Sequence, residues 1–177
     1  MQCIFPLLLF LNVASFSVAQ GGDQTPPGEV PVYLPSSYDP EIASPLVIFL
    51  HGFAPLTPVW YDILLPLQKD ANSHGYIFAK PNGSVDGLGD YYWNATDACC
   101  DMFGNNPDHV SYILALVESI QQQYNIDPQR IHLVGHSNGG FMCHRMACES
   151  PETFASVVSI SGAMWYDESH CQPSAPI

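Results

Sequence analysis

The chain has 177 residues, which corresponds to about one domain, and hydrophobic residues make up 47% of it, too large a share for a disordered protein. Seventeen acidic residues against four basic ones give a formal net charge of -13. This charge repels polyanions, so nucleic acid and a stable association with anionic membranes are excluded as partners. Neutral or cationic substrates are compatible with it.

The first 19 residues carry no charged side chain, and their apolar stretch at 4–16 is followed by small residues that end at Ala19. This pattern is typical of a secretory signal peptide cleaved after Ala19. The apolar stretch is shorter than the ~20 residues that span a bilayer, which favours cleavage over a membrane anchor. We therefore expect a secreted, extracellular protein with a signal peptide at 1–19, an exposed lead-in at 20–29 and a folded domain at 30–177.

Glycosylation sequons and cysteines fit that destination. The sequons begin at Asn82 and Asn94, although Asn94 is also compatible with a structural role. In an oxidising compartment the cysteines after the signal are disulfide candidates: Cys99, Cys100, Cys143, Cys148 and Cys171. Because five is odd, one thiol is free, intermolecular or without its partner. A zinc site built from Cys99, Cys100, Cys143, His144 and Cys148 matches no known ligand spacing, so we expect no metal.

The first half of the domain predicts short strands around one helix. A strand is expected at 30–34, and the continuous apolar run at 46–50 is typical of a strand covered on both faces. Thr57 and the proline after it begin a helix that we expect to end at Gly75. Residues 76–79 are the next predicted strand.

The second half continues the alternation after a long loop. Residues 82–105 are rich in Gly, Asp, Asn and aromatic residues, and a loop of this length is often functional. Helices are then predicted from a start signal at 106–108 to about 124 and at 139–149, and strands at 131–134 and 154–161. Alternating strands and helices predict an α/β fold with a mostly parallel sheet and helices on both faces.

One motif carries the chemistry. Gly135-His136-Ser137-Asn138-Gly139 has the pattern G-x-S-x-G, and it follows a predicted strand and opens a predicted helix. In this context the turn is strained and presents the serine hydroxyl above the sheet, while glycines at both ends avoid crowding. The sequence therefore predicts Ser137 as a nucleophile and the backbone N–H of Asn138 as a donor to a substrate oxyanion.

A second oxyanion donor is expected at the end of the strand at 46–50. His51, Gly52 and Phe53 follow that strand directly. A second donor to the oxyanion is expected in such a loop at the end of an earlier strand, and the backbone N–H of Phe53 is the candidate.

Residues 30–171 resemble the α/β-hydrolase family of secreted polyhydroxybutyrate depolymerases and feruloyl esterases. The resemblance is carried by FLHGF at 49–53, WNATDACC at 93–100 and GHSNGGFM at 135–142, of which the second is the most specific. It implies a serine esterase that acts through an acyl-enzyme on a hydroxyalkanoate polyester or on cell-wall esters, without a cofactor. It also implies a sheet truncated before the family's last two strands.

The acid and the histidine of a catalytic triad are not evident. In this fold they follow the serine, and Asp167 and His170 have the right order but lie three residues apart in one predicted loop. They are weak candidates. By resemblance, the acid and the histidine lie beyond Ile177, so we expect the chain to be an incomplete form of an esterase.

Aromatic residues could contact an acyl group or a polymer: Trp60, Tyr61, Tyr91, Tyr92 and Trp93. Two other functions compete with the esterase. A secreted polymer- or carbohydrate-binding protein could keep the fold without the triad. A serine peptidase could use the same serine motif, although peptidases with a similar motif carry a large extra domain.

Overall fold

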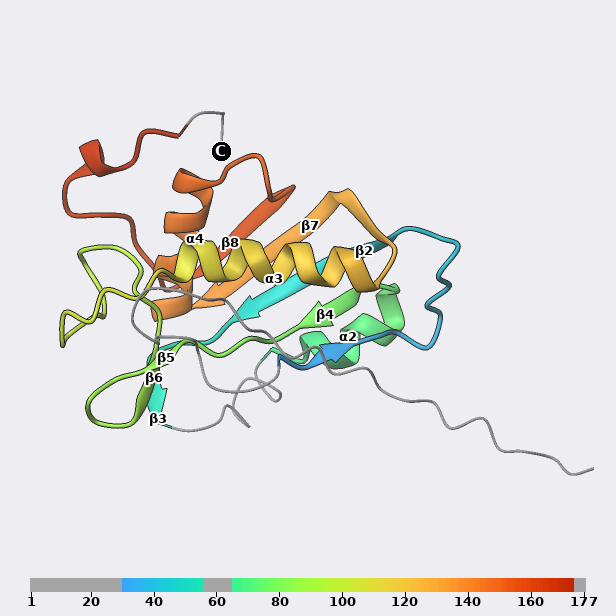
Figure 1. The fold of residues 1–177 in the computed structure, drawn as a ribbon, viewed down its shortest axis with the longest axis horizontal. Helices are drawn as coiled ribbons and strands as arrows, with labels where there is room; N and C mark the ends of the chain where they lie inside the picture. The colour runs from blue at the N-terminus through green and yellow to red at the C-terminus, as the bar shows by residue number, and fades with distance from the viewer. Residues whose placement is uncertain (1–29, 56–64, 174–177) are drawn as a thin grey trace, which may run out of the picture.

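The computed structural model of the chain describes residues 30–55 and 65–173. Its main sheet has five strands in the order β1-β4-β2-β7-β8 (Figure 1). Their bounds are β1 Val32–Tyr33, β2 Ser44–Leu50, β4 Ile77–Ala79, β7 Ile126–His136 and β8 Ser156–Ile160. β1 is antiparallel to β4, and the other four strands are parallel to one another. The predicted α/β class with a mostly parallel sheet is confirmed.

Helices cover both faces of this sheet, as predicted (Figure 1). α3 (His109–Gln123) and α4 (Asn138–Glu149) pack on one face and share a core with β2 and β7. On the other face, α2 (Leu67–His74) buries Ala71 against side chains of β2 and β4. Because both faces are covered, the side chains of β2 are buried or half-buried along its length, which explains its continuous apolar sequence.

The ends of the helices follow local rules. The Asp108 carboxylate accepts the backbone N–H of Ser111 at 3.0 Å and caps α3. α2 ends at Gly75, whose φ of 72° is the left-handed conformation that favours glycine. The start of α3 and the end of α2 agree with the prediction. The predicted start at Thr57 of the helix that ends at Gly75 lies outside the described residues.

The predicted loop at 82–105 contains structure that the sequence did not indicate. β5 (Ser84–Val85) and β6 (Asp90–Tyr92) form a hairpin, and β6 pairs with β3 (Ala54–Pro55) in a second, three-stranded sheet. β3 directly follows the segment at 51–53 after β2. The hairpin is therefore held beside the carboxyl end of the main sheet, where ligands of parallel α/β folds bind.

The described cysteines form two disulfides. Cys99 is bonded to Cys100, Cys148 is bonded to Cys171, and Cys143 is a buried free thiol. Cys143 was a disulfide candidate, and its burial beneath the turn at Ser137 explains why it is unpaired. Pairing of the others contradicts the zinc alternative, and the described residues hold no group of three or more His, Cys, Asp or Glu side chains suited to a metal ion.

Candidate active site

The turn at Ser137 has the strained geometry that the motif predicts. β7 ends at His136, α4 begins at Asn138, and Ser137 between them has φ 51° and ψ -121°. A positive φ is costly for a residue with a Cβ atom, so the surrounding structure must impose it. The Ser137 N–H donates to the carbonyl of Ile160 at the end of β8 at 2.7 Å, which ties the turn to the neighbouring strand.

The two glycines of the motif are required by close backbone contacts, as predicted. A Cβ atom on Gly135 would lie 2.2 Å from the carbonyl oxygen of Gly139 and 2.7 Å from Cys143 Sγ. A Cβ atom on Gly139 would lie 2.2 Å from the carbonyl oxygen of Leu50 and 2.6 Å from that of His51. The start of α4 is therefore in contact with the end of β2.

This contact brings the two predicted oxyanion donors onto adjoining segments. Phe53, which is half-buried, follows the end of β2, and Asn138 opens α4. The first N–H groups of a helix have no acceptor within the helix, and the positive end of the helix dipole is located there. An oxyanion formed at Ser137 would therefore meet unpaired N–H groups and a favourable potential.

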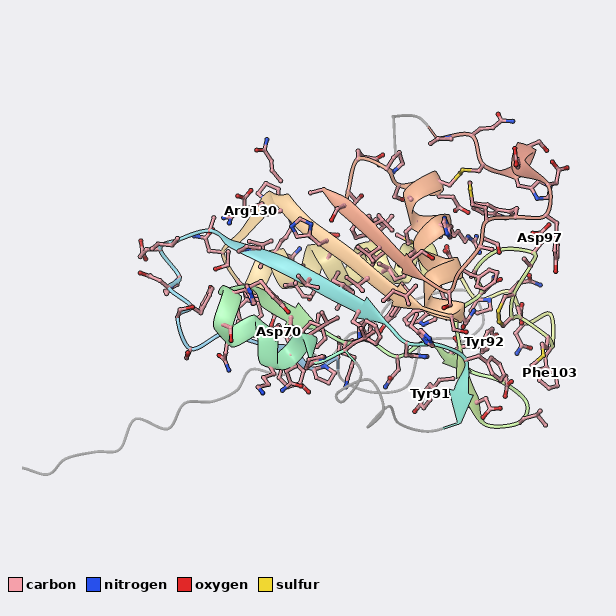
Figure 2. The ribbon with its side chains drawn as sticks, turned by 180° about the vertical axis from the view of Figure 1, so that it is seen from behind. Asp70, Tyr91, Tyr92, Asp97, Phe103 and Arg130 are labelled. Atoms are coloured by element: carbon pink, nitrogen blue, oxygen red, sulfur yellow. A yellow bond between two sulfur atoms is a disulfide. The ribbon has the colours of Figure 1, made fainter. Side chains whose placement is uncertain are left out.

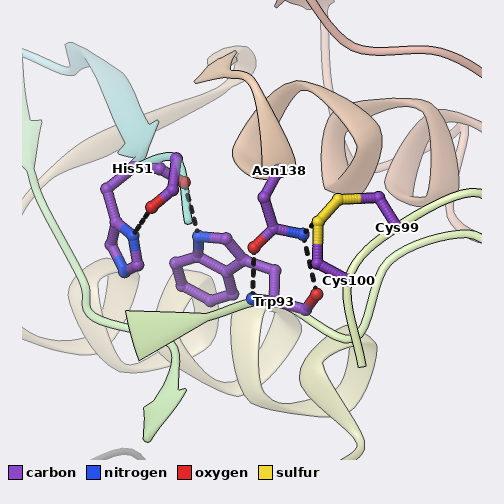
Figure 3. Close-up of a disulfide and its surroundings, with 6 residues drawn as sticks. His51, Trp93, Cys99, Cys100 and Asn138 are labelled. Atoms are coloured by element: carbon purple, nitrogen blue, oxygen red, sulfur yellow. Dashed lines mark hydrogen bonds between the residues drawn. A yellow bond between two sulfur atoms is a disulfide. The ribbon is translucent and has the colours of Figure 1, made fainter. Parts of the chain in front are cut away.

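The Asn138 side chain clamps the backbone of Trp93, a contact that the sequence did not reveal (Figure 3). Its Oδ1 accepts the Trp93 N–H at 2.6 Å, and its Nδ2 donates to the Trp93 carbonyl at 2.9 Å. The Trp93 indole N–H in turn donates to the His51 carbonyl at 3.0 Å. Both Asn138 and Trp93 have no exposed surface.

Two buried imidazoles flank the Trp93 ring, with centroids 5.1 Å away for His51 and 5.2 Å for His109. Nδ1 of His51 donates to the Gly52 carbonyl at 2.7 Å, and its Nε2 accepts the Gly83 N–H at 3.0 Å. Burial, with a smaller effect of Lys80, lowers the pKa of His51 to about 4. This imidazole is therefore neutral at physiological pH.

His109 is also neutral. Burial, followed by the Arg145 guanidinium, lowers its pKa to about 3. Its Nδ1 accepts the Asn94 N–H at 2.7 Å, and its Nε2 lies 3.2 Å from the Ser84 backbone nitrogen and 3.0 Å from Ser84 Oγ. This serine–histidine contact joins β5 to the start of α3 in the interior, because both side chains are buried.

The predicted substrate contact of Tyr92 and Trp93 is corrected, whereas Tyr91 is half-buried. Tyr92 is 1% exposed and Trp93 is 0% exposed, so both pack in the interior, Tyr92 at the end of the small sheet (Figure 2). Side chains without accessible surface cannot line a substrate groove. Trp60 and Tyr61 lie outside the described residues.

Asp167 and His170, the weak candidates for acid and base, lie in the segment after β8 that is tied to α4. The Cys148–Cys171 disulfide holds His170 at the C-terminal end of α4. Cys148 lies ten residues after Asn138, which corresponds to about 15 Å along a helix.

The partners of these side chains agree with that placement. His170 Nδ1 lies 3.8 Å from the Asp97 carboxylate, while the Asp167 carboxylate accepts the Ser169 N–H. An imidazole so far from Ser137 cannot take the proton from its hydroxyl. The structure therefore does not place these two weak candidates beside Ser137, where a base and its acid are needed.

The two sequon asparagines are half-buried. Asn94 Nδ2 donates to the Pro107 carbonyl at 3.0 Å, and its backbone carbonyl accepts from Arg145 Nη1 at 2.9 Å. Asn94 therefore has the structural role that its position allowed. Asn82 is adjacent to Gly83, which binds His51.

Sequence reasoning missed the side chains of His51, His109 and Asn138, which join the loops around Ser137. Only Asn138 carried a signal, because it lies inside the serine motif. The contacts of the two histidines join residues that are 15 to 32 positions apart in the chain.

Comparisons with known proteins agree with this arrangement. The chain is 29% identical over 117 residues to feruloyl esterase B of Neurospora crassa, which covers 66% of the chain and 38% of that protein. It is 28% identical over 89 residues to a poly(3-hydroxybutyrate) depolymerase of Ralstonia pickettii, which covers 49% of the chain and 18% of that protein.

Among solved structures, a thermostable esterase superposes with a TM-score of 0.59 at 24% identity, over 80% of this chain and 39% of that one. This likeness shows the α/β-hydrolase fold. The chain thus spans about two fifths or less of the length of these three proteins. The family model described as "Putative esterase" matches residues 27–175. The chain belongs to this esterase family.

Proposed function

We propose that the chain carries the nucleophile and the oxyanion site of a serine carboxylic ester hydrolase. Ser137 Oγ attacks the ester carbonyl, and the N–H groups of Phe53 and Asn138 bind the oxyanion. The alcohol leaves with a proton, an acyl-enzyme remains on Ser137, and water hydrolyses it. The observation that carries the proposal is the strained Ser137 turn between β7 and α4.

A base must accept the Ser137 proton and return it to the leaving alcohol. Among the residues that the structure describes, Ser137 Oγ has no hydrogen-bond partner, and His170 is held at the far end of α4. We therefore place the base and its acid outside the described residues. This agrees with the small share of its relatives' length that the chain covers.

The proposed substrates are neutral esters: a hydroxyalkanoate polyester or an ester of cell-wall polysaccharide. The names of the relatives support these two classes, and the net charge of -13 disfavours anionic polymers. No cofactor takes part in this chemistry. The uncharged, apolar sequence of residues 1–19 and the Cys148–Cys171 disulfide support secretion. None of the described helices could cross a bilayer.

Labelling with a fluorophosphonate tests the nucleophile. The probe forms a covalent bond to an activated serine, and peptide mass spectrometry of the labelled complete protein should place it on Ser137. Ser137→Ala should abolish both labelling and ester hydrolysis, whereas Ser73→Ala, at an exposed serine of α2, should change neither. Ester turnover retained by Ser137→Ala would overturn the proposal.

A second candidate is a polymer- or carbohydrate-binding protein without turnover. The absence of a described partner for Ser137 Oγ favours it. Two results together would establish this function instead. The wild-type protein should not be labelled by the probe, and its saturable binding to an insoluble polyester or xylan should be unchanged in Ser137→Ala. Labelling of Ser137 by the probe would exclude a binding function without turnover.

A further inference from the structure

We propose that Trp93 is a positioning residue that fixes the two backbone oxyanion donors relative to each other. The inference rests on the proposed function, because it takes Ser137 as the nucleophile. Trp93 does not touch the substrate, since its side chain has no exposed surface. It acts through the two segments that it joins.

One end of Trp93 holds the segment that contains Phe53. The indole N–H donates to the His51 carbonyl at 3.0 Å (Figure 3). This carbonyl belongs to the peptide group that precedes the one carrying the Phe53 N–H. A rotation that swung the Phe53 N–H away from Ser137 would therefore strain or break the indole hydrogen bond.

The backbone of Trp93 holds the other donor. Asn138 receives the Trp93 N–H on Oδ1 at 2.6 Å and returns a hydrogen bond from Nδ2 to the Trp93 carbonyl at 2.9 Å. Two hydrogen bonds through one side chain fix both its position and its orientation. Asn138, whose backbone N–H is one oxyanion donor, is thus bound to Trp93. The Trp93 indole in turn holds the segment that carries the other donor, the Phe53 N–H.

The surroundings prevent the indole from moving. His51 and His109 lie against its ring, and each imidazole has both nitrogens engaged in hydrogen bonds. If the Trp93 ring served only to fill the core, its role would depend on its shape and not on its N–H group. The indole N–H therefore distinguishes positioning from packing.

A tryptophan analogue in which sulfur replaces the indole N–H tests this at position 93 of the complete protein. The ring keeps its shape and loses the hydrogen bond to the His51 carbonyl. We expect kcat to fall by roughly 10- to 100-fold, because displaced oxyanion donors lose transition-state stabilisation. KM should change by less than about threefold, because ground-state binding is not affected.

Two further measurements separate positioning from packing. Affinity for a boronic acid that mimics the tetrahedral intermediate should fall by the same factor as kcat, and Tm should stay that of the wild type. The same analogue at Trp165, a half-buried residue after β8, is the matched control and should leave kcat unchanged. Unchanged kcat in the Trp93 variant, or a lower Tm with unchanged boronic acid affinity of the folded fraction, would overturn the assignment.

Asn138→Ala offers a second route if the analogue variant does not fold. It keeps the backbone N–H donor but removes the clamp on Trp93, so kcat should fall to a similar extent. Because both changes break one path, their combination should cost no more than either alone, and additive losses would contradict the proposal. Turnover retained by Ser137→Ala would overturn the proposed function together with this assignment. If Ser137→Ala loses turnover but the Trp93 and Asn138 variants keep it, only the assignment is overturned.

Discussion

At the scale of single residues, the geometry at Ser137 depends on nearby glycines, which have no Cβ atom. Gly139 has room for no side chain, because a Cβ atom there would lie 2.2 Å from the Leu50 carbonyl oxygen and 2.6 Å from that of His51. Both contacts are with backbone, which cannot rotate away as the end of a side chain can. The start of α4 and the end of β2 must therefore separate if Gly139 is replaced.

Gly139→Ala should accordingly damage both stability and reactivity. We expect a loss of about 1–3 kcal/mol in the free energy of unfolding and a fluorophosphonate labelling rate at Ser137 that is about 100-fold lower. Urea unfolding and time-resolved labelling measure these two effects. The control is Gly104→Asn, since Gly104 is exposed, has φ 64° and has open space around it. Labelling of Gly139→Ala at the wild-type rate would show that the oxyanion site tolerates the shift.

Residue types in local motifs could be recognised in the sequence, and pairs brought together by folding could not. Ser137 and its two glycines lie within five residues, and their strained turn is as predicted. The partners of His51 and His109 lie in other loops, so no spacing in the chain points to them. The same limit made Trp93 resemble a substrate contact, because its burial results from packing between those histidines.

At the scale of elements, long periodic segments were predictable, and the short strands of the small sheet were not. α3 begins directly after the predicted start signal at 106–108 and ends one residue before Tyr124, because its cap and its apolar spacing are both local. The strands β3 and β5 have two residues each, and β3 pairs with a segment more than 30 residues away. Such pairing leaves no period in the sequence, so the region was predicted as a loop.

The segment after β8 is tied to the end of α4 by the Cys148–Cys171 disulfide. His170 is therefore kept away from Ser137 as long as the bond is intact. We expect His170→Gln to leave fluorophosphonate labelling and ester hydrolysis within about twofold of the wild type, since the exposed Asp97–His170 contact contributes little.

Breaking the tether tests the same point from the other side. Cys148→Ala combined with Cys171→Ala should cost about 3 kcal/mol of stability by releasing a loop of this length, and it should make the segment sensitive to proteolysis. Labelling of the folded protein at Ser137 should persist. A base role for His170 would instead require a large loss of labelling in His170→Gln.

At the scale of the whole molecule, two neutral imidazoles lie at the junction between the small sheet, α3 and the main sheet. Burial lowers the pKa of His51 to about 4 and that of His109 to about 3, whereas an unfolded chain has histidines near 6.5. Below pH 6.5 the unfolded chain therefore binds protons that the folded chain refuses. Their contribution to stability is complete above pH 6.5 and is lost as the pH falls toward 4.

The free energy of unfolding should thus decrease on acidification across this window. The slope is about 1.4 kcal/mol per pH unit for each histidine, so the pair contributes up to about 2.8 kcal/mol per unit. Urea unfolding followed at several pH values between 4 and 7 measures it. Arg145 and Lys80 act in the same direction, because their positive charges disfavour a second one on the imidazoles.

The histidines themselves can be separated from the many carboxylates that titrate nearby. His109→Gln removes one of the two buried imidazoles. It should reduce the slope of unfolding free energy against pH by about 1.4 kcal/mol per pH unit, which corresponds to one proton, even if the variant is less stable at pH 7. His74→Gln, at an exposed histidine of α2, should leave the slope as in the wild type. An equal slope in all three proteins would mean that the carboxylates alone set the acid sensitivity, and that the network around Trp93 accepts a charged imidazole.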